Sequence, residues 1–425
     1  MKDNLILLTS TFPFGTGETF LETELTYLAQ GFSSIIILPT KKTLTQNSRP
    51  IPKNCTVDSS IISQVNSESS LRRVISKLFV ALKSSFFYQE LAEIFPTRIN
   101  KEVIDNLLTY SRDAALSRKA IQEIRKNNSA DNEKWIIYSY WCNGATLGAT
   151  IAGTDIPVIS RTHRGDLYEE LHSKNYIPLR EKTIANIEVL YSISKNGVQY
   201  LSNRYSKYQS KFQLSRLGIP IPDENEMQHN EKKIPQTLTL ASCSSINKNK
   251  RVDRIALSLK KFASKHPKIN LYWNHFGSGP GLNNLKKLTA DFPPNLSASL
   301  HGHIDNQELL DWYSKNPVHI FINLSKSEGI PVSIMEANSY RIPAIATNVG
   351  GTSELVNTES GWLLNRDFNS SEIQATLEEA LLKHSIRIQK ADKAYKTCLS
   401  HFDSGKNYPD FTKKLKEVML EHDAH

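Results

Sequence analysis

Short apolar runs alternate with longer amphipathic stretches through the first half of the chain. An apolar run of this length predicts a buried strand, and apolar residues at helical spacing predict a helix. The alternation of the two predicts βα units and therefore a parallel sheet. The predicted strands cover residues 5–8, 35–38, 135–139, 158–160 and 189–193.

The second half repeats the same alternation. Its predicted helices include residues 252–265 and 306–313. Two doubly wound, Rossmann-like α/β domains are expected, with ligands bound beyond the carboxyl ends of the strands. The predicted strands of this half cover residues 238–241, 271–276, 299–301, 318–324 and 344–347.

A cluster of helix and strand breakers separates the two halves. Gly218, Pro220 and Pro222 lie within five residues, and a polar run follows them up to Pro235. Such a segment is typical of a linker. The expected organisation is a first domain over residues 1–216, a linker over 217–235, a second domain over 236–400 and a last helix within 401–425 that crosses back to the first domain.

Composition is that of an ordinary globular protein of two domains. The chain has 425 residues, of which 39% are hydrophobic and 22% are charged. No apolar stretch approaches the roughly 18 residues that span a bilayer. The four cysteines, far apart and without Cys-x-x-Cys spacing, indicate neither a disulfide framework nor a zinc site. We therefore expect a cytoplasmic protein.

The net charge of +9 favours a polyanionic neighbour. Residues 71–87 place apolar side chains at helical spacing with basic residues between them. Such a helix can lie on an anionic membrane surface, or it can pack its apolar face into the core, and the sequence favours neither interpretation. Nucleic acid is not expected as a partner, because the basic residues are dispersed and no recognition motif accompanies them.

Two glutamates eight positions apart, Glu328 and Glu336, carry the strongest chemical signal. The strand at 318–324 leads into a polar loop that holds Glu328, and Pro331 is expected to be the first residue of a helix that holds Glu336. Carboxylates accept hydrogen bonds only, and a helix N-terminus attracts anions. The pair therefore suggests a ligand with hydroxyl groups on both sides of a phosphate, such as a nucleotide sugar, although each acid alone would more simply be solvated.

The segment from Ser327 to Ala337 resembles the nucleotide-sugar site of the retaining GT-B glycosyltransferases of family 4, also called glycosyl transferases group 1. The resemblance continues through residues 341–354, where a short strand precedes the turn Gly350-Gly351. It implies GT-B architecture, in which two doubly wound domains face each other across a cleft. It also implies an exopolysaccharide or lipopolysaccharide type of enzyme.

Two motifs of the first half resemble family elements. Gly15 and Gly17 form a loop at a helix N-terminus that is suited to a phosphate or to an incoming acceptor. His163 stands in a segment similar to the family's His-Gly-x-Asp-Leu-Tyr element, which would place it near the reacting centre. Asp166 is expected either to orient His163 or to cap the following helix.

Two segments of the second half resemble the family's phosphate-binding and base-binding elements. Lys250 stands at the position of the diphosphate-binding lysine, but Ser245 occupies the position of its partner arginine. Arg251 or Lys248 could supply the missing charge. Gly277 belongs to a Gly-x-Gly-Pro element that resembles the family's backbone contacts to the nucleotide base.

The resemblance implies transfer of a sugar from a UDP- or GDP-linked donor to a hydroxyl group with retention of configuration. Glu328, His163 and Lys250 are then the candidate catalytic residues. Glu336 is expected at the ribose hydroxyls, and Glu328 with the backbone of Gly329, Ile330 and Pro331 at the hydroxyls of the donor sugar. Arg251, Gly277, Gly15 and Gly17 complete the expected binding set.

No metal or other cofactor is expected, because the sequence contains no Asp-x-Asp motif. The expected partners are the nucleotide sugar, a lipid-linked saccharide acceptor and an anionic membrane, with a peripheral position on the inner face of the plasma membrane. Two alternatives stay open at this point. One is a GT-B nucleotide-sugar epimerase, and the other is a non-catalytic nucleotide-sugar-binding protein.

Overall fold

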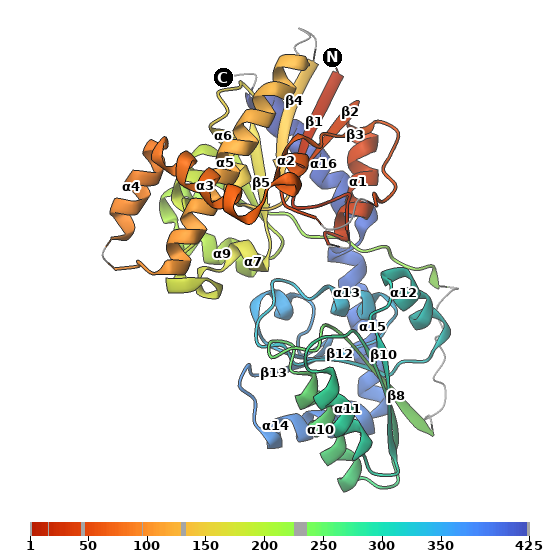
Figure 1. The fold of residues 1–425 in the computed structure, drawn as a ribbon. Helices are drawn as coiled ribbons and strands as arrows, with labels where there is room; N and C mark the ends of the chain where they lie inside the picture. Colours follow the sequence, from red (N-terminus) through yellow and green to blue (C-terminus); the bar gives the residue numbers. More distant parts are fainter. Residues whose placement is uncertain are drawn as a thin grey trace. The chain divides into compact units, whose positions relative to one another are not determined.

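The computed structural model describes residues 2–15, 17–43, 47–95, 97–128, 133–224 and 236–422. These residues form two units, each with its own parallel sheet (Figure 1). The first unit joins Met1–Leu217 to Ser404–His425, and the second comprises Gly218–Asp403. The predicted linker lies partly outside the described residues, because residues 225–235 are not among them.

The first unit is built on a seven-stranded sheet in the order β3-β2-β1-β4-β5-β6-β7. Its central strands are the apolar runs of the sequence, and Leu5 of β1 pairs with Ile35 of β2 and with Ile136 of β4. All five strands predicted in this half are confirmed. The strands are β1 (Lys2–Thr9), β2 (Ser34–Pro39), β3 (Cys55–Val57), β4 (Glu133–Ser139), β5 (Val158–Thr162), β6 (Val189–Ser192) and β7 (Phe212–Leu214).

Helices cover this sheet (Figure 1). Helix α1 buries Leu21, Leu25 and Leu28, as its apolar spacing predicts. Helix α16 packs against α1 and β4. The helices are α1 (Phe20–Gly31), α2 (Ser60–Ser67), α3 (Ser70–Leu82), α4 (Ser85–Ile94), α5 (Lys101–Asn127), α6 (Gly144–Thr150), α7 (Arg164–Leu167), η1 (Glu169–Leu171), η2 (Ser173–Asn175), α8 (Arg180–Asn186), α9 (Lys195–Arg204), η3 (Ser206–Lys211) and α16 (Ser404–His422).

A fully buried ion pair connects three elements of the first unit. Arg161 of β5 donates to the carboxylate of Glu24 on α1, with a nitrogen–oxygen distance of 2.5 Å. Its guanidinium also lies 4.0 Å from the ring centroid of Phe411 on α16. Removing one member of such a pair leaves an uncompensated buried charge, which is strongly destabilising. The pair therefore makes the packing of α1, β5 and α16 interdependent.

The second unit has a six-stranded parallel sheet in the order β10-β9-β8-β11-β12-β13. All five strands predicted in this half are confirmed, and α10 has the predicted bounds. The elements are β8 (Thr237–Cys243), α10 (Val252–Lys265), β9 (Asn270–Phe276), α11 (Leu282–Ala290), β10 (Leu296–Gly302), α12 (Asn306–Lys315), β11 (Ile320–Asn323), α13 (Val332–Ser339), β12 (Ala344–Thr347), η5 (Gly350–Glu354), β13 (Gly361–Leu364), α14 (Ser370–Leu382) and α15 (His384–His401).

Two predicted helix boundaries are wrong. Pro331 is the residue before α13 rather than its first residue, since its ψ of 101° is extended. The amphipathic stretch 71–87 is also not one helix, because α3 ends at Leu82 and α4 begins at Ser85. The extended backbone of Pro331 delays the start of α13 by one residue, and a break between Leu82 and Ser85 divides the second stretch.

Helix α3 turns its apolar side chains outward. Leu71 and Leu82 are each 70% exposed, and Val74, Ile75 and Leu78 are exposed as well. The interpretation of a core-packed amphipathic helix is therefore wrong for α3. Within the described parts of the chain, no helix is long and apolar enough to cross a membrane.

Candidate functional site

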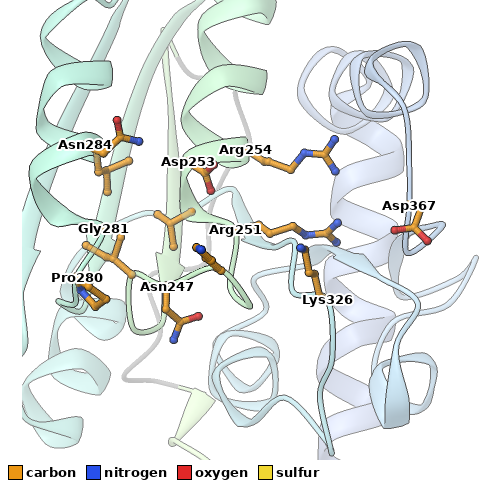
Figure 2. Close-up of a pocket in the computed structure, with 13 residues that line it drawn as sticks. Asn247, Arg251, Asp253, Arg254, Pro280, Gly281, Asn284, Lys326 and Asp367 are labelled. Atoms are coloured by element: carbon orange, nitrogen blue, oxygen red, sulfur yellow. The ribbon is translucent and has the colours of Figure 1, made fainter. Parts of the chain in front are cut away.

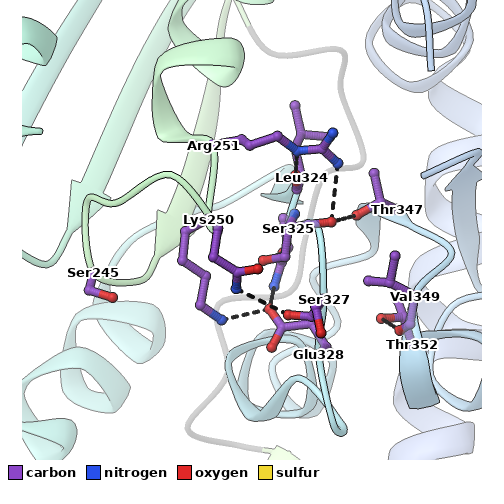
Figure 3. A network of polar contacts seen from close by, with 12 residues as sticks. Ser245, Lys250, Arg251, Leu324, Ser325, Ser327, Glu328, Thr347, Val349 and Thr352 are labelled. Carbon is purple, nitrogen blue, oxygen red and sulfur yellow. Dashed lines mark hydrogen bonds and ion pairs between the residues drawn. The ribbon is translucent and has the colours of Figure 1, made fainter. Parts of the chain in front are cut away.

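The centre of the candidate site is an ion pair between two loops of the second unit. Strands β8 and β11 are neighbours in the sheet, so the loops at their carboxyl ends lie together. Lys250, from the loop after β8, donates to Oε1 of Glu328 in the loop after β11 at 2.6 Å (Figure 3). Glu328 is buried, and Asn323 at the end of β11 also donates to Oε1. The structure thus brings together two of the predicted catalytic residues.

Asparagine side chains fix the two loops. The side-chain oxygen of Asn247 accepts hydrogen bonds from the amides of Asn249 and Lys250, which is a typical turn-forming contact. Asn249 then donates to the carbonyl of Ser327, and its own carbonyl accepts from the amide of Lys326. These contacts hold the backbone on both sides of the Lys250–Glu328 pair.

The Arg251 side chain is held by the protein's own backbone, which argues against its predicted role as a phosphate-binding charge beside Lys250, although Arg251 does line the pocket that also contains Lys248. Its guanidinium donates to three carbonyl oxygens, those of Leu324, Ser325 and Arg366. Figure 3 shows this side chain directed away from Glu328. Arg251 also has a φ of 50°, in the left-handed region. The residue therefore stabilises the loops that carry the site instead of facing a ligand of Lys250.

Two further residues lie apart from the Lys250–Glu328 pair. They are Ser245, at the position of the missing arginine, and Lys248, the other candidate to replace its charge. Ser245 accepts a hydrogen bond from Asn247 and is exposed. Lys248 is exposed and lines a pocket of about 660 Å³ together with Arg254 and Lys326. Neither Glu328 nor Glu336 lines this pocket, whose walls also include Asn247, Gly281 and Asp367 (Figure 2). Lys248 thus borders a basic pocket beside the site.

Glu336 lies on α13 in a neutral surrounding. It is buried, and Asn306 at the start of α12 donates to its Oε1 at 2.6 Å. Burial raises the pKa of Glu336 to about 7, an effect that the Asn306 hydrogen bond opposes. The charges of Glu336 and Lys250 both act on the Cys243 thiol, whose pKa burial raises to about 12. Both groups are therefore close to the carboxyl end of β8.

The backbone between the glutamates is packed against the Gly350-Gly351 turn. The amide of Gly351 donates to the carbonyl of Gly329 at 2.7 Å. Gly350 has a φ of 55°, and a Cβ at this position would lie 2.0 Å from the carbonyl oxygen of Glu328. Only glycine allows so close an approach. Ile330 is also buried, so residues 329–331 form a fixed entry to α13.

Gly277 is another position where the backbone needs glycine. Its φ is 129°, and a Cβ would lie 2.0 Å from the carbonyl oxygen of Ser244. Next to it, the ring of Phe276 stacks on His301 with centroids 4.4 Å apart. The structure thus puts the β9 and β10 loops beside the β8 loop, as a base-binding element would require.

In the glycine loop of the first unit, backbone amides bind a carboxylate of the same chain, that of Glu18. The carboxylate of Glu18 accepts from the amides of Ser10, Thr11 and Phe12 at 2.7–2.9 Å. Those three amides follow β1 and are occupied by Glu18, so a phosphate at this loop would need other donors, and the role of Gly15 and Gly17 stays a prediction. Gly15, with a φ of 74°, and Gly17 belong to this closed loop.

His163 follows β5 in the same unit and is buried between two aromatic rings. The centroids of Tyr140 and Trp141 lie 4.5 and 4.6 Å from the His163 ring. Burial, with a smaller effect of Arg161, lowers the pKa of His163 well below its usual value, so the imidazole is neutral at pH 7. Trp141 in turn donates to Glu18, which joins His163 to the glycine loop.

Asp166 is a helix cap. Its carboxylate accepts from the backbone amides of His163 and Cys142, both at 2.7 Å. The structure therefore shows Asp166 as a cap and not as a residue that orients the His163 imidazole. Burial raises the pKa of Asp166 to about 7, and the nearby Arg180 guanidinium opposes this effect.

Several residues of the site were not singled out from the sequence. Asn306 and Asn323 contact the two glutamates, and Glu18 and Trp141 organise the loop beside His163. The Asn-x-Asn spacing of 247–249 is a turn signal that could have indicated the fixed loop at Lys250. No local pattern connects Asn306 to Glu336, because they are thirty residues apart.

Comparison with known proteins assigns the second unit. Residues 223–397 match the family described as Glycosyl transferases group 1. The chain is also 32% identical over 109 residues to the "putative teichuronic acid biosynthesis glycosyltransferase TuaC" of Bacillus subtilis (strain 168). That match covers 25% of this chain and 26% of TuaC, about a quarter of the relative's length. Residues 223–397 are therefore similar to a glycosyltransferase group 1 domain.

Solved structures resemble the whole chain. Sucrose-phosphate synthase from Thermosynechococcus elongatus matches with a TM-score of 0.70, at 11% identity, over 99% of this chain and 100% of that chain. The Anabaena protein HepE, solved with UDP and glucose, matches with a TM-score of 0.61, at 12% identity, over 98% of this chain and 100% of that chain. At such identities the likeness shows the fold alone, and it confirms the predicted GT-B class of two Rossmann-like domains.

Proposed function

We propose that this protein is a retaining glycosyltransferase that moves a sugar from a nucleoside diphosphate to a hydroxyl group of a lipid-linked or surface-polysaccharide acceptor. The observation that carries the proposal is the Lys250–Glu328 ion pair at the carboxyl ends of β8 and β11. It lies within the residues that match the group 1 family. The names of the relatives point the same way, since TuaC is described as a teichuronic acid glycosyltransferase and HepE was solved with UDP and glucose.

Lys250 is assigned to the leaving diphosphate. When the bond between the anomeric carbon and the diphosphate oxygen breaks, negative charge grows on the diphosphate. An ammonium group has three N–H donors, and Glu328 accepts one of them. The other two can donate to phosphate oxygens, and the first amides of α13 add the positive end of a helix dipole. This arrangement stabilises the leaving group with the chain's own charges, so no metal is required.

The two carboxylates are assigned to hydroxyl groups at opposite ends of the donor. Glu336, held by Asn306, accepts from the ribose, and Glu328 accepts from the transferred sugar beside the backbone of residues 329–331. His163 is assigned to a position near the reacting centre, where its buried, neutral imidazole can contribute a hydrogen bond but not a charge. In this proposal the protein acts in the cytoplasm, at the inner face of the plasma membrane, where a lipid-linked acceptor would lie.

Incubation with a panel of UDP-, GDP- and ADP-linked sugars and lipid-linked acceptors tests the proposal. We expect release of nucleoside diphosphate and a product with the anomeric configuration of the donor, read by nuclear magnetic resonance. Activity should persist in a metal chelator. Glu328→Gln and Lys250→Met should each lower kcat at least about a hundredfold, because Lys250 contacts the charge that develops on the leaving diphosphate and Glu328 holds both Lys250 and the transferred sugar.

Matched controls separate chemistry from folding. Lys260→Met removes an exposed lysine of the same unit, one that pairs with Asp291 on the surface, and should leave kcat unchanged. An epimerised donor without transfer would identify an epimerase, and donor binding without turnover would identify a binding protein. Either result contradicts the proposal, as does full activity in Glu328→Gln.

A further inference from the structure

Helix α3 has an unusual orientation for an amphipathic helix. Its polar side faces the protein, where Lys77 pairs with Asp105 of α5 and Ser76 accepts from Arg112 of the same helix. Its opposite side presents an unbroken apolar face to solvent. We call this the α3 apolar face, and it consists of Leu71, Val74, Ile75, Leu78, Phe79 and Leu82, which are 48–70% exposed.

This face collects much of the exposed apolar surface. Among the described residues, fourteen large apolar side chains are exposed, and six of them form the α3 apolar face. The rest are spread over the two units. A soluble protein rarely leaves so dense a set uncovered unless something binds it. Figure 1 shows α3 and α4 at the outer edge of the first unit, where such a face is accessible.

Basic residues border the α3 apolar face, and helix α3 itself carries no acidic residue. Helix α3 and Lys83 carry four basic side chains and no acidic one. Arg72 and Lys83 are exposed, and the Lys83 ammonium lies 4.1 Å from the ring centroid of Phe79. The acids that approach α3 are neutralised, since Asp105 pairs with Lys77 and Glu68 with Arg112. The net charge at the edge of the face is therefore positive.

We propose that the α3 apolar face lies in the headgroup layer of an anionic membrane, with Arg72 and Lys83 at the lipid phosphates. An apolar helix face bordered by basic residues is the arrangement that binds such a surface, because burial and charge attraction act together. The proposal names the surface through which the enzyme proposed above would reach a lipid-linked acceptor. Membrane binding itself does not depend on sugar transfer, since the face belongs to a different unit from Lys250 and Glu328.

Vesicle sedimentation of the purified full chain tests the proposal. The probes are vesicles of phosphatidylcholine alone and of phosphatidylcholine with about a quarter phosphatidylglycerol. We expect binding to the anionic vesicles that weakens in high salt. Leu71→Ser/Leu78→Ser/Leu82→Ser should bind at least tenfold more weakly, and Arg72→Gln/Lys83→Gln roughly thirtyfold more weakly to anionic vesicles only.

The matched control is Leu257→Ser/Ile388→Ser/Leu420→Ser, which removes three apolar side chains of similar exposure elsewhere. It should bind as the original protein does. Each variant should keep its thermal stabilisation by nucleotide sugar, so that a failure of membrane binding is distinguished from a failure of the donor site. The proposal is wrong if the original protein binds neither vesicle type, or if the control loses as much binding. It is also wrong if the face mediates self-association in sedimentation velocity without binding vesicles.

Discussion

The two glutamates of the candidate site differ in what neutralises them. Glu328 has a direct cationic partner in Lys250, whereas Glu336 has only the neutral amide of Asn306. A buried carboxyl group without a cation prefers to stay protonated, which is why the pKa of Glu336 is raised to about 7. The ionised form of Glu336 is the better acceptor for ribose hydroxyls, so ligand binding and protonation oppose each other.

Nucleotide-sugar binding should therefore strengthen with pH between 6 and 8. With a pKa of about 7, roughly one Glu336 in ten is ionised at pH 6 and nine in ten at pH 8. We expect the affinity for a UDP- or GDP-sugar to rise about five- to tenfold over this range, measured by calorimetry. The diphosphate of a nucleotide sugar stays ionised throughout, so it adds no dependence of its own.

Protein stability should depend on pH in the opposite direction. The folded-state pKa is raised above the ordinary glutamate value of 4.5, so the neutral form contributes stability below about pH 4.5 that is lost as the pH rises through about 7. Glu336→Gln should remove the pH dependence of affinity, weaken donor binding and lessen the pH dependence of stability, to which buried Asp166 also contributes. A Glu336→Gln variant that keeps the rise in affinity would show that another group titrates.

At the scale of elements, the site depends on how closely two loops approach. Gly350 and Gly302 both have positive φ, at 55° and 74°, but only Gly350 lies against another chain segment. A Cβ at Gly302 would meet nothing within 4 Å. A comparison of alanine substitutions at Gly350 and Gly302 therefore separates the free-energy cost of the backbone conformation from the cost of a steric clash.

Gly350→Ala should destabilise the protein by about 3 kcal/mol or more and lower kcat at least a hundredfold, because the added methyl group displaces the Glu328 carbonyl. Gly302→Ala should cost only about 1 kcal/mol, the conformational part alone. Urea unfolding of both variants measures the difference. Equal losses of stability in the two variants would mean that the loop yields to the methyl group.

The central strands and the longer edge strand β10 were predictable from the sequence, but three short edge strands were not. The central strands are continuous apolar runs, which is the expected pattern for a parallel sheet covered on both faces. The missed strands β3, β7 and β13 are all edge strands of three or four residues. A short edge strand is only partly covered and so needs no apolar run. The positions of Glu328 on a loop and of Glu336 on a helix were predictable from the sequence, but the contact of Asn306 with Glu336 was not.

At the scale of the whole molecule, the first unit is discontinuous in sequence. Its sheet is formed by residues before Leu217, but α16 returns after the second unit to cover β4 and α1. Phe411 of α16 is fully buried, with its ring 5.1 Å from Tyr138 and 5.3 Å from Tyr191. The core of the first unit thus includes a residue from the far end of the sequence.

Phe411→Ala should destabilise the first unit by about 3–5 kcal/mol, because it opens a cavity against two tyrosines and uncovers the Arg161–Glu24 pair. Hydrogen–deuterium exchange should show faster exchange in β4 of the first unit and no change in β8 of the second. Leu420→Ala, on the same helix at 57% exposure, is the control and should change neither. Faster exchange in both units would show that they unfold together.

The return of α16 has a consequence for the order in which the protein is made. Residues 218–403 emerge from the ribosome before α16, and they contain every strand of the second sheet. The second sheet can form before the first unit is complete. Until α16 is made, the surface that Phe411 covers stays accessible to chaperones and proteases. Nascent chains stalled ahead of α16 should therefore already bind a nucleotide while their amino-terminal half is still cleaved, so that donor recognition precedes completion of the other half.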